Sequence, residues 1–344
     1  MSNIAFFSNK ISSVGGIEKI TSNLVNEFVK QDNVFILTFE DNAKMVYKLD
    51  DHVKIISLTK QSNKLKDLFL INKVLKKNKI DFLIIQDKDF GYFSYLRINK
   101  LSKYKIIFCD HSSFNYYFSN NITNEVERRR KYTKHADAVV VLTSDNVNLY
   151  KKEFGYKDKK VYKIPNFLDF ENKNNKYDSS SKVITAVGRL HKQKRFDLLI
   201  KSFIEVNKKY PDWSLEIYGD GEEREKLQKQ IDLNNLSQCV FLKGKYGCMD
   251  DAYLNKSFLC ATSEFEGFGI MILEALNYNL PVITFDCLSG PSDMVEDNKN
   301  GFLVKPLDVK ELTGKLLNLI NDEKLRITFS KNSFAQSQKF KFEK

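Results

Sequence analysis

Residues 257–277 read SFLCATSEFEGFGIMILEALN, and they combine a strand, a turn and a helix in one short stretch. The apolar run Ser257–Ala261 predicts a buried strand, and the glycines Gly267 and Gly269 predict the turn that follows it. A second apolar run predicts a helix over Ile270–Leu276. A strand followed directly by a helix is the repeating unit of α/β proteins, so this stretch indicates the fold class.

The same alternation of strands and helices extends over the whole chain. Amphipathic stretches such as Phe196–Lys209 and Glu222–Asn234 predict helices between short, β-branched apolar runs. Strands that alternate with helices predict βαβ units and a parallel sheet. Besides Ser257–Ala261, the predicted strands are Ile4–Phe7, Val34–Thr38, Val53–Ile56, Phe82–Ile85, Lys105–Phe108, Ala138–Leu142, Val161–Ile164, Val183–Val187, Ser214–Tyr218, Val240–Leu242 and Val282–Phe285.

Between the two sets of strands, residues 167–181 are polar and poor in apolar side chains, which predicts a linker. A chain of 344 residues is also long for a single hydrophobic core. We therefore expect two doubly wound, Rossmann-like domains, residues 1–166 and 182–344, that face each other across a cleft. In such sheets, ligands bind outside the carboxyl ends of the strands.

The composition excludes several classes of protein. No apolar run approaches the ~20 residues that a membrane-spanning helix needs, and the N-terminus has no cleavage-site pattern. The five cysteines are odd in number and form no Cys-x-x-Cys pair. They predict reduced thiols in a cytoplasmic protein, with neither a disulfide framework nor a zinc site.

The net charge of +11 belongs to the first half of the chain. Residues 1–165 hold 29 Lys and Arg against 18 Asp and Glu, whereas residues 166–344 hold 26 of each kind. The surplus therefore indicates a partner of the first domain rather than general solubility. Nucleic acid and an anionic membrane surface both fit this charge.

Three loops at predicted strand ends carry candidate binding groups. Gly15 and Gly16 precede a helix, where backbone N–H groups are able to approach an anion, although a turn that needs positive φ explains them equally well. Arg189 and Lys194 follow the Val183–Val187 strand and suit a diphosphate, although a solvated basic loop also accounts for them. His111 follows another strand, where a structural and a catalytic role are equally open.

The acids Glu266 and Glu274, eight residues apart, are the most specific signal. Glu266 precedes the predicted helix start, and Glu274 lies about one turn inside the helix. A carboxylate there is able to accept two sugar hydroxyls, and the free N–H groups of the helix start suit phosphate oxygens. A helix cap explains one acid but leaves Glu274 in an apolar helix unexplained.

These motifs, taken together, resemble those of the retaining GT-B glycosyltransferases of glycosyltransferase family 4. The Glu-x7-Glu spacing is met by Glu266 and Glu274. In chain order the other motifs are GGIE (15–18), His111, IPNFLD (164–169), VGRLHKQKRFD (187–197), GDG (219–221), FLKG (241–244), GPSDMV (290–295) and NGFLV (300–304).

The resemblance implies a role for each candidate residue. Glu274 would bind the ribose of a nucleotide-sugar donor, and Arg189 with Lys194 would bind its diphosphate. Glu266 would hold the sugar, and His111 would meet the sugar or the incoming hydroxyl. The other implied donor-binding residues are Gly15 and Gly16, Gly219, Lys243 and Gly244 near the base, and Gly267, Phe268, Gly269, Ile270 and Met271 near the sugar and phosphates.

The resemblance also implies the reaction. It is that of a metal-independent hexosyltransferase without a resident cofactor, which takes a hexose or N-acetylhexosamine from a UDP-sugar and retains the anomeric configuration. The acceptor would be a glycan or a lipid-diphosphate-linked glycan of a bacterial surface polysaccharide: capsule, lipopolysaccharide or teichoic acid. The first domain would bind this acceptor at the anionic inner membrane surface, without nucleic acid as a partner. The family's last helix is expected to begin where SFAQSQKFKFEK (333–344) stops, which predicts a truncated chain.

Other functions stay open on the sequence alone. A GT-B nucleotide-sugar epimerase or phosphorylase would use the same donor site without this acceptor. A basic α/β nucleic-acid-binding protein would explain the charge, but its basic residues lack interleaved stacking aromatics. A homologue without activity would keep the same motifs.

Overall fold

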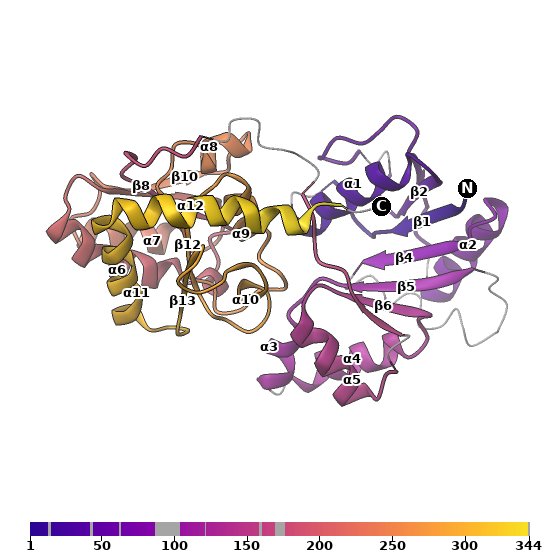
Figure 1. The fold of residues 1–344 in the computed structure, drawn as a ribbon. Helices are drawn as coiled ribbons and strands as arrows, with labels where there is room; N and C mark the ends of the chain where they lie inside the picture. Colours follow the sequence, from indigo (N-terminus) through magenta and orange to yellow (C-terminus); the bar gives the residue numbers. More distant parts are fainter. Residues whose placement is uncertain are drawn as a thin grey trace. The chain divides into compact units, whose positions relative to one another are not determined.

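The computed structural model describes residues 1–12, 15–41, 44–61, 63–86, 104–120, 122–157, 160–168 and 176–342. The chain divides into two compact units, residues 1–166 and 167–344. Each unit contains one parallel sheet with helices on its faces (Figure 1). Within the described parts of the chain, no helix has both the length and the apolar character needed to span a membrane.

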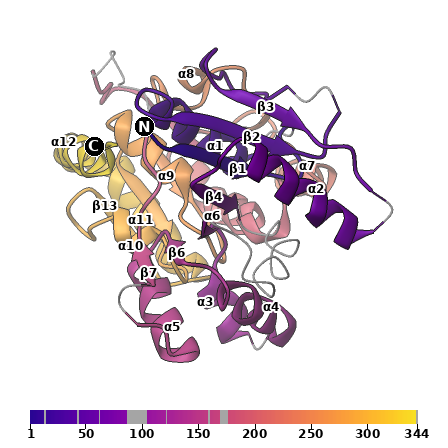
Figure 2. The ribbon, with the colours of Figure 1, turned by 90° about the vertical axis from the view of Figure 1, so that its right-hand side faces the viewer.

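Unit 1 is built on a seven-stranded sheet in the order β3-β2-β1-β4-β5-β6-β7, in which every neighbouring pair is parallel. Strands β3, β2 and β1 lie side by side, with β3 at the edge of the sheet (Figure 2). The strands are β1 Asn3–Phe7, β2 Asn33–Thr38, β3 Lys54–Ser57, β4 Phe82–Gln86, β5 Lys105–Asp110, β6 Ala138–Val141 and β7 Val161–Lys163. The helices are α1 Gly16–Phe28, α2 Lys64–Lys77, α3 Phe114–Ser119, α4 Thr123–Thr133 and α5 Ser144–Phe154.

The inner strands β1, β2 and β4 of unit 1 are apolar almost without alternation because both faces of the sheet are buried there. Ala5 and Phe7 pack in a core that also receives side chains from α2, α3 and α5. Ile4 and Phe6, which point to the opposite face, pack in a second core with Val25 of α1. The two cores place α1 on one face of the sheet and α2, α3 and α5 on the opposite face.

Unit 2 is built on a six-stranded parallel sheet in the order β10-β9-β8-β11-β12-β13. Its strands are β8 Val183–Val187, β9 Ser214–Tyr218, β10 Val240–Gly244, β11 Phe258–Ala261, β12 Val282–Phe285 and β13 Gly301–Val304. Its helices are α6 Phe196–Lys209, α7 Arg224–Leu233, α8 Met249–Tyr253, α9 Ile270–Asn277, α10 Pro291–Met294, α11 Val309–Asn321 and α12 Glu323–Ser337, with short 3-10 turns at Lys192–Lys194 and Gln338–Phe340.

Each sheet has one point where the strand order reverses. In unit 1 it lies between β1 and β4, and in unit 2 between β8 and β11. The connections that leave two such strands run to opposite sides, which opens a crevice at their carboxyl ends. The segments after β8 and β11 therefore form the expected ligand-binding position of unit 2.

The parallel α/β architecture is confirmed, and several elements missing from the prediction are now visible. Helix α4 buries Arg129 and Thr133, and α12 buries Arg326, Ser330 and Ser333, so neither shows an apolar stripe. Residues 333–337, which the prediction left before a further helix, form the end of α12 instead. Of the predicted linker, residues 169–175 lie outside the described residues, whereas the Tyr177 hydroxyl donates to the Ser257 carbonyl at 2.6 Å.

Candidate functional site

A buried ion pair marks the reversal point of the unit 2 sheet. Lys194 lies in the 3-10 turn after β8, and Glu266 lies in the loop after β11. Their atoms Nζ and Oε1 are 2.5 Å apart, and both side chains are largely buried. The structure thus brings together one cation and one anion, both predicted from the sequence, at the carboxyl ends of two neighbouring strands.

Hydrogen bonds between the two loops hold this pair in place. The Thr262 hydroxyl donates to the Lys194 carbonyl at 2.8 Å, and the Glu264 amide donates to the Gln193 carbonyl at 2.8 Å. The Gln193 side chain donates to the Phe265 carbonyl at 2.7 Å. Because the two loops are hydrogen-bonded to each other next to the ion pair, Lys194 and Glu266 are held in place by the backbone around them.

Two glycines allow the backbone to pack closely beneath Lys194. A Cβ atom on Gly188 would lie 2.9 Å from Lys194 Cε, so the lysine stem lies directly on the backbone there. A Cβ atom on Gly219, which has φ +138°, would overlap with the carbonyl oxygen of Gly188. Gly219 is therefore required by backbone packing, whatever it contributes to a ligand.

Arg189 and the end of β10 lie at the same carboxyl edge of the sheet as the ion pair. Arg189 is exposed, and no hydrogen bond or ion pair holds its guanidinium within the described part of the chain. At the end of β10, the Gly244 carbonyl accepts from the Gly219 amide at 2.8 Å. Lys243 instead turns to Glu216, with Nζ and Oε1 3.3 Å apart. The exposed guanidinium of Arg189 is available to an anionic ligand.

The helix start after Glu266 has the predicted geometry. Gly269 is the N-cap residue of α9 with φ +88°, a conformation that favours glycine, and the helix begins at Ile270. Gly267 precedes this cap, and Phe268 and Met271 are buried. The first N–H groups of a helix have no partner within it, so this end supplies hydrogen-bond donors.

Glu274 lies inside α9 and is also buried, which answers why an acid occurs in an apolar helix. Its Oε2 atom accepts a hydrogen bond from the Tyr253 hydroxyl of α8 at 2.6 Å. The carboxylate therefore does not cap its helix and has a defined partner. Tyr253 carries no motif, and nothing in the sequence links it to Glu274.

His111 of unit 1 follows β5, the strand next to β4 at the reversal point. Its Nε2 atom is hydrogen-bonded to Oε1 of Gln86, the last residue of the neighbouring strand β4. Burial lowers the pKa of His111 to about 4, against an opposing effect of the adjacent Asp110 carboxylate. The imidazole is therefore neutral at neutral pH and is able to serve as a hydrogen-bond donor or acceptor, but not as a cation.

Beneath His111 lies a buried ionic network that the sequence did not predict. Asp110 is fully buried, and its Oδ2 atom is 3.0 Å from Arg129 Nε and accepts from the Tyr150 hydroxyl at 2.6 Å. Its Oδ1 atom accepts from the Ser112 hydroxyl at 2.6 Å. The end of β5 is therefore linked to α4 and α5 directly below the histidine.

The glycine pair of unit 1, Gly15 and Gly16, does not form the turn with positive φ that the sequence left open. Gly15 has φ −167°, an extended conformation open to any residue, and Gly16 begins α1 with a negative φ. The proposal that this pair serves a turn with positive φ is therefore wrong. A Cβ atom on Gly15 would overlap with the Glu18 carboxylate, whereas one on Gly16 would meet open space.

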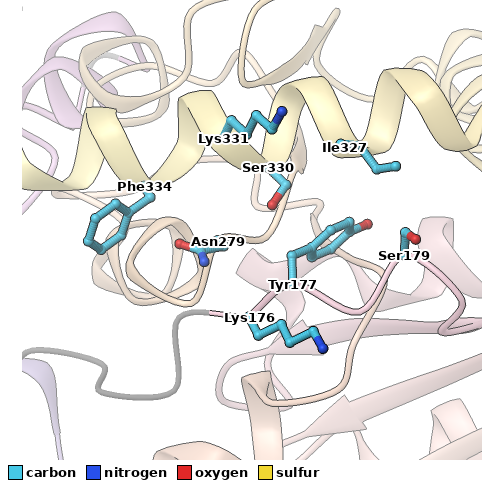
Figure 3. Close-up of a pocket in the computed structure, with 8 residues that line it drawn as sticks. All are labelled: Lys176, Tyr177, Ser179, Asn279, Ile327, Ser330, Lys331 and Phe334. Carbon is cyan, nitrogen blue, oxygen red and sulfur yellow. The ribbon is translucent and has the colours of Figure 1, made fainter.

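A separate pocket lies at the opposite end of the unit 2 sheet (Figure 3). Its volume is about 570 Å³, and its walls come from α12, from the segment before β8 and from Asn279, which precedes β12. None of the predicted site residues lines it. It is lined by Lys176, Tyr177, Ser179, Asn279, Ile327, Ser330, Lys331 and Phe334.

Two family models match the chain, one for each half. The model "Glycosyl transferases group 1" matches residues 169–336, and the model "Glycosyltransferase Family 4" matches residues 14–172. The chain is 31% identical to an uncharacterized glycosyltransferase of Haemophilus influenzae, over 100% of this chain and 98% of that protein. It is 29% identical to the amylovoran biosynthesis glycosyltransferase AmsD of Erwinia amylovora, over 95% of this chain and 92% of that protein.

Solved structures share the fold of the chain. Staphylococcus aureus TarM, in a complex with fondaparinux, α-GlcNAc-glycerol and UDP, has a TM-score of 0.83 at 18% identity, over 99% of this chain and 97% of that chain. The lipopolysaccharide outer core galactosyltransferase WaaB has a TM-score of 0.71 at 22% identity, over 98% of each chain. At these identities the likeness concerns the fold alone.

Proposed function

The chain belongs to the GT-B glycosyltransferases of the group 1 and family 4 type, and from this premise we propose that it transfers a sugar from a UDP-sugar with retention of configuration. The sugar is a hexose or N-acetylhexosamine, and the acceptor is a glycan or lipid-linked glycan of a surface polysaccharide. AmsD is named for amylovoran biosynthesis, and the TarM structure contains UDP, fondaparinux and α-GlcNAc-glycerol. Both support this proposal over epimerisation or nucleic-acid binding.

The observation that carries the proposal is the Lys194–Glu266 pair, 2.5 Å apart at the reversal point of the sheet. A bound diphosphate would compete for Lys194, with the exposed Arg189 as a second cation. Glu266 would then accept hydrogen bonds from hydroxyl groups of the donor sugar. The helix start at Ile270 would offer N–H groups to the phosphates, and Glu274 would bind the ribose.

The proposed reaction needs no nucleophile from the protein. The bond between the anomeric carbon and the phosphate oxygen breaks, and UDP leaves with the electron pair. The acceptor oxygen attacks the same face of the sugar, and its proton passes to the departing phosphate. Lys194, Arg189 and the helix start would stabilise the negative charge that develops on the phosphate, which is why no metal is included.

In unit 1 we assign the acceptor to the β5 end. His111, neutral at neutral pH, would hydrogen-bond the transferred sugar or the incoming hydroxyl, and its bond to Gln86 fixes the orientation of the ring. Gly16 would leave space for an anionic group beside the start of α1. Both proposed roles concern residues of unit 1 only.

A panel of UDP-sugars tests the proposed donor. We expect one UDP-sugar to stabilise the protein against thermal unfolding, since a ligand at 100 times its Kd adds about 2.7 kcal/mol. The same sugar should be transferred to a polysaccharide acceptor, at a rate that excess EDTA leaves unchanged. Conversion of the UDP-sugar to its epimer without acceptor would contradict the transferase assignment, and selective stabilisation by another nucleoside diphosphate sugar would contradict UDP.

Helix α2 carries the proposed contact with the membrane. It packs against the unit 1 core through Ile71 and Leu75, and Leu68 is also buried. Its outer face, however, exposes Leu65 by 71% and Phe69 by 74%. These side chains are one helical turn apart and therefore lie on the same face of the helix.

Lysines surround this apolar pair. Lys66, Lys73, Lys76 and Lys77 are exposed, and within the described residues none of them forms an ion pair. Asp67, the one acid of α2, is buried and accepts from the Gln61 amide at 2.7 Å. A face with apolar side chains and unpaired lysines suits an anionic lipid surface, which attracts each lysine by about 1 kcal/mol.

Substitution of the two apolar residues tests this surface. The variant L65S/F69S should bind anionic liposomes at least about tenfold more weakly at low salt, because each apolar side chain contributes roughly 1.5–3 kcal/mol when it is buried. Cosedimentation gives the partition coefficient. Leu233 of α7, exposed by 84%, provides the matched control: L233S should bind as the parent protein does. Equal binding by L65S/F69S, or binding that high salt leaves unchanged, would contradict the proposal.

A further inference from the structure

Two tyrosine–carboxylate hydrogen bonds link α8 and α9 in opposite directions. The Tyr253 hydroxyl of α8 donates to Glu274 Oε2 of α9 at 2.6 Å. The hydroxyl of Tyr278, the C-cap residue of α9, donates back to Asp250 Oδ1 of α8 at 2.5 Å. The two rings pack against each other with centroids 5.4 Å apart. Each helix therefore supplies one tyrosine and one acid.

The shorter of the two helices is itself fixed to the sheet. Thr185 of the central strand β8 donates through its hydroxyl to the Ala252 carbonyl of α8 at 2.8 Å. Tyr253 follows directly and is fully buried. The hydroxyl of Tyr253 is thus held at a defined position relative to the strands whose carboxyl ends carry the candidate site.

The position of the Tyr253 hydroxyl matters because a glutamate carboxylate is able to rotate about its last side-chain torsion. The last torsion of glutamate is broad, so that a carboxylate without partners samples many orientations. A carboxylate accepts about four hydrogen bonds, of which Tyr253 uses one. Burial, and the nearby charge of Glu274, raise the pKa of Tyr253 well above its usual range. Tyr253 therefore remains protonated and keeps donating at any pH at which the enzyme is assayed.

We propose that Tyr253 is a positioning residue that orients the Glu274 carboxylate toward the two hydroxyls of the donor ribose, and so sets the preference for ribonucleotides over 2′-deoxyribonucleotides. This inference rests on the proposed function, because it takes the assignment of Glu274 to ribose as given. A site built to bind a hydroxyl rejects the analogue that lacks it, provided that its own groups are correctly aimed. Without Tyr253, the carboxylate loses the hydrogen bond from α8 that contributes to this alignment.

The test compares UDP with 2′-deoxy-UDP by calorimetry. In Y253F, Kd for UDP should rise about tenfold, as expected for a lost hydrogen bond to a charged group, while Kd for 2′-deoxy-UDP should change less than about threefold. The ratio of the two constants, which measures discrimination at the 2′ position, should therefore fall. An equal loss for both ligands, with the ratio unchanged, would reduce Tyr253 to a packing residue and overturn the proposal.

Tyr278 provides the matched control. Y278F removes the same group from the same pair of rings but breaks the bond to Asp250 and leaves the bond from Tyr253 to Glu274 in place. Its 2′ discrimination should equal that of the parent protein. A loss of discrimination in Y278F as large as in Y253F would also overturn the proposal, since general loosening of the two helices would then explain both.

Two further variants separate this inference from its premise. If E274Q binds UDP as the parent protein does, Glu274 is not the ribose ligand and the proposed donor site fails. If E274Q weakens UDP but Y253F does not, only the role of Tyr253 fails. Should Y253F not fold, the double variant Y253F/E274Q removes the buried charge. It should match E274Q alone in affinity for both nucleotides, because Tyr253 acts through that carboxylate, and a further loss would overturn the proposal.

Discussion

Replacement of Glu266 by glutamine is expected to lower kcat/KM for the donor by about 100- to 1,000-fold, the range found when one preorganised electrostatic group of an active site is removed. The carboxylate is buried and 2.5 Å from Lys194, so its charge acts at short range. In the proposed reaction the sugar gains positive charge as the phosphate departs, and Glu266 would stabilise that charge more in the transition state than in the ground state. Steady-state kinetics with the preferred UDP-sugar measure the effect.

The distribution of the loss between kcat and KM identifies the role of Glu266. An interaction made mainly in the transition state lowers kcat, whereas a uniform binding interaction raises KM alone. E264Q is the matched control. Glu264 lies two residues earlier, its side chain is 42% exposed, and its ion pair with the Arg195 guanidinium is long, at 3.9 Å. E264Q should change kcat/KM less than about twofold. A kcat in E266Q equal to that of the parent protein would remove Glu266 from the reaction.

Replacement of Arg129 by methionine is expected to lower the free energy of unfolding by about 3–5 kcal/mol, because it leaves a buried charge without its partner. Asp110 is fully buried, and Arg129 Nε lies 3.0 Å from its Oδ2 atom. Methionine has a similar apolar stem, so the change removes the charge with little loss of volume. Urea denaturation followed by far-UV circular dichroism measures the loss, and hydrogen exchange at β5 localises it to unit 1.

Arg128, the neighbouring arginine, provides the control for R129M. Arg128 is 48% exposed, and its ion pair with Glu125 lies at the surface, so R128M should change the stability by less than about 0.5 kcal/mol. Trp213, the single tryptophan, lies in unit 2, and its fluorescence reports on the unit without the substitution. Equal stability of R129M and R128M would contradict the importance of the buried pair.

The pH dependence of R129M checks the same cause. Burial raises the pKa of Asp110, but Arg129 and the hydrogen bonds from Ser112 and Tyr150 outweigh it and bring the pKa below its usual value. The resulting stabilisation is present above the pKa of the unfolded chain, roughly 3.9, and is lost as the pH falls through the lower folded value. The deficit of R129M against the parent protein should therefore shrink in acid.

The fold could be predicted where burial alone decides the residue type. Strands Val183–Val187, Ser214–Tyr218 and Val282–Phe285 have the predicted bounds because most of their positions are buried and apolar. Helix Phe196–Lys209 also has the predicted bounds, since its apolar stripe faces one core. Helices α4 and α12 were missed because polar side chains, Arg129 and Arg326 among them, occupy their buried faces.

The candidate site could be predicted only in part, because its members come together through strand order. The spacing of Glu266 and Glu274 identified both acids, and the loop after β8 identified Lys194. Only the pairing of β8 with β11 brings Lys194 against Glu266, and local sequence does not contain that pairing. The bond from Tyr253 to Glu274 depends in the same way on how α8 docks, so no pattern indicated it.

The close backbone crossings at Gly188, Gly219 and Gly221 bear on how related genes are recognised. A side chain at Gly219 would overlap with the Gly188 carbonyl, and one at Gly221 would overlap with the Leu190 carbonyl, in any protein that folds this way. The GDG signature is thus a requirement of backbone packing, independent of any catalytic role. A genome search that relies on it is therefore expected to retrieve active and inactive chains alike. Under the proposed function, Glu266 and Glu274 are the positions at which we expect the two to differ.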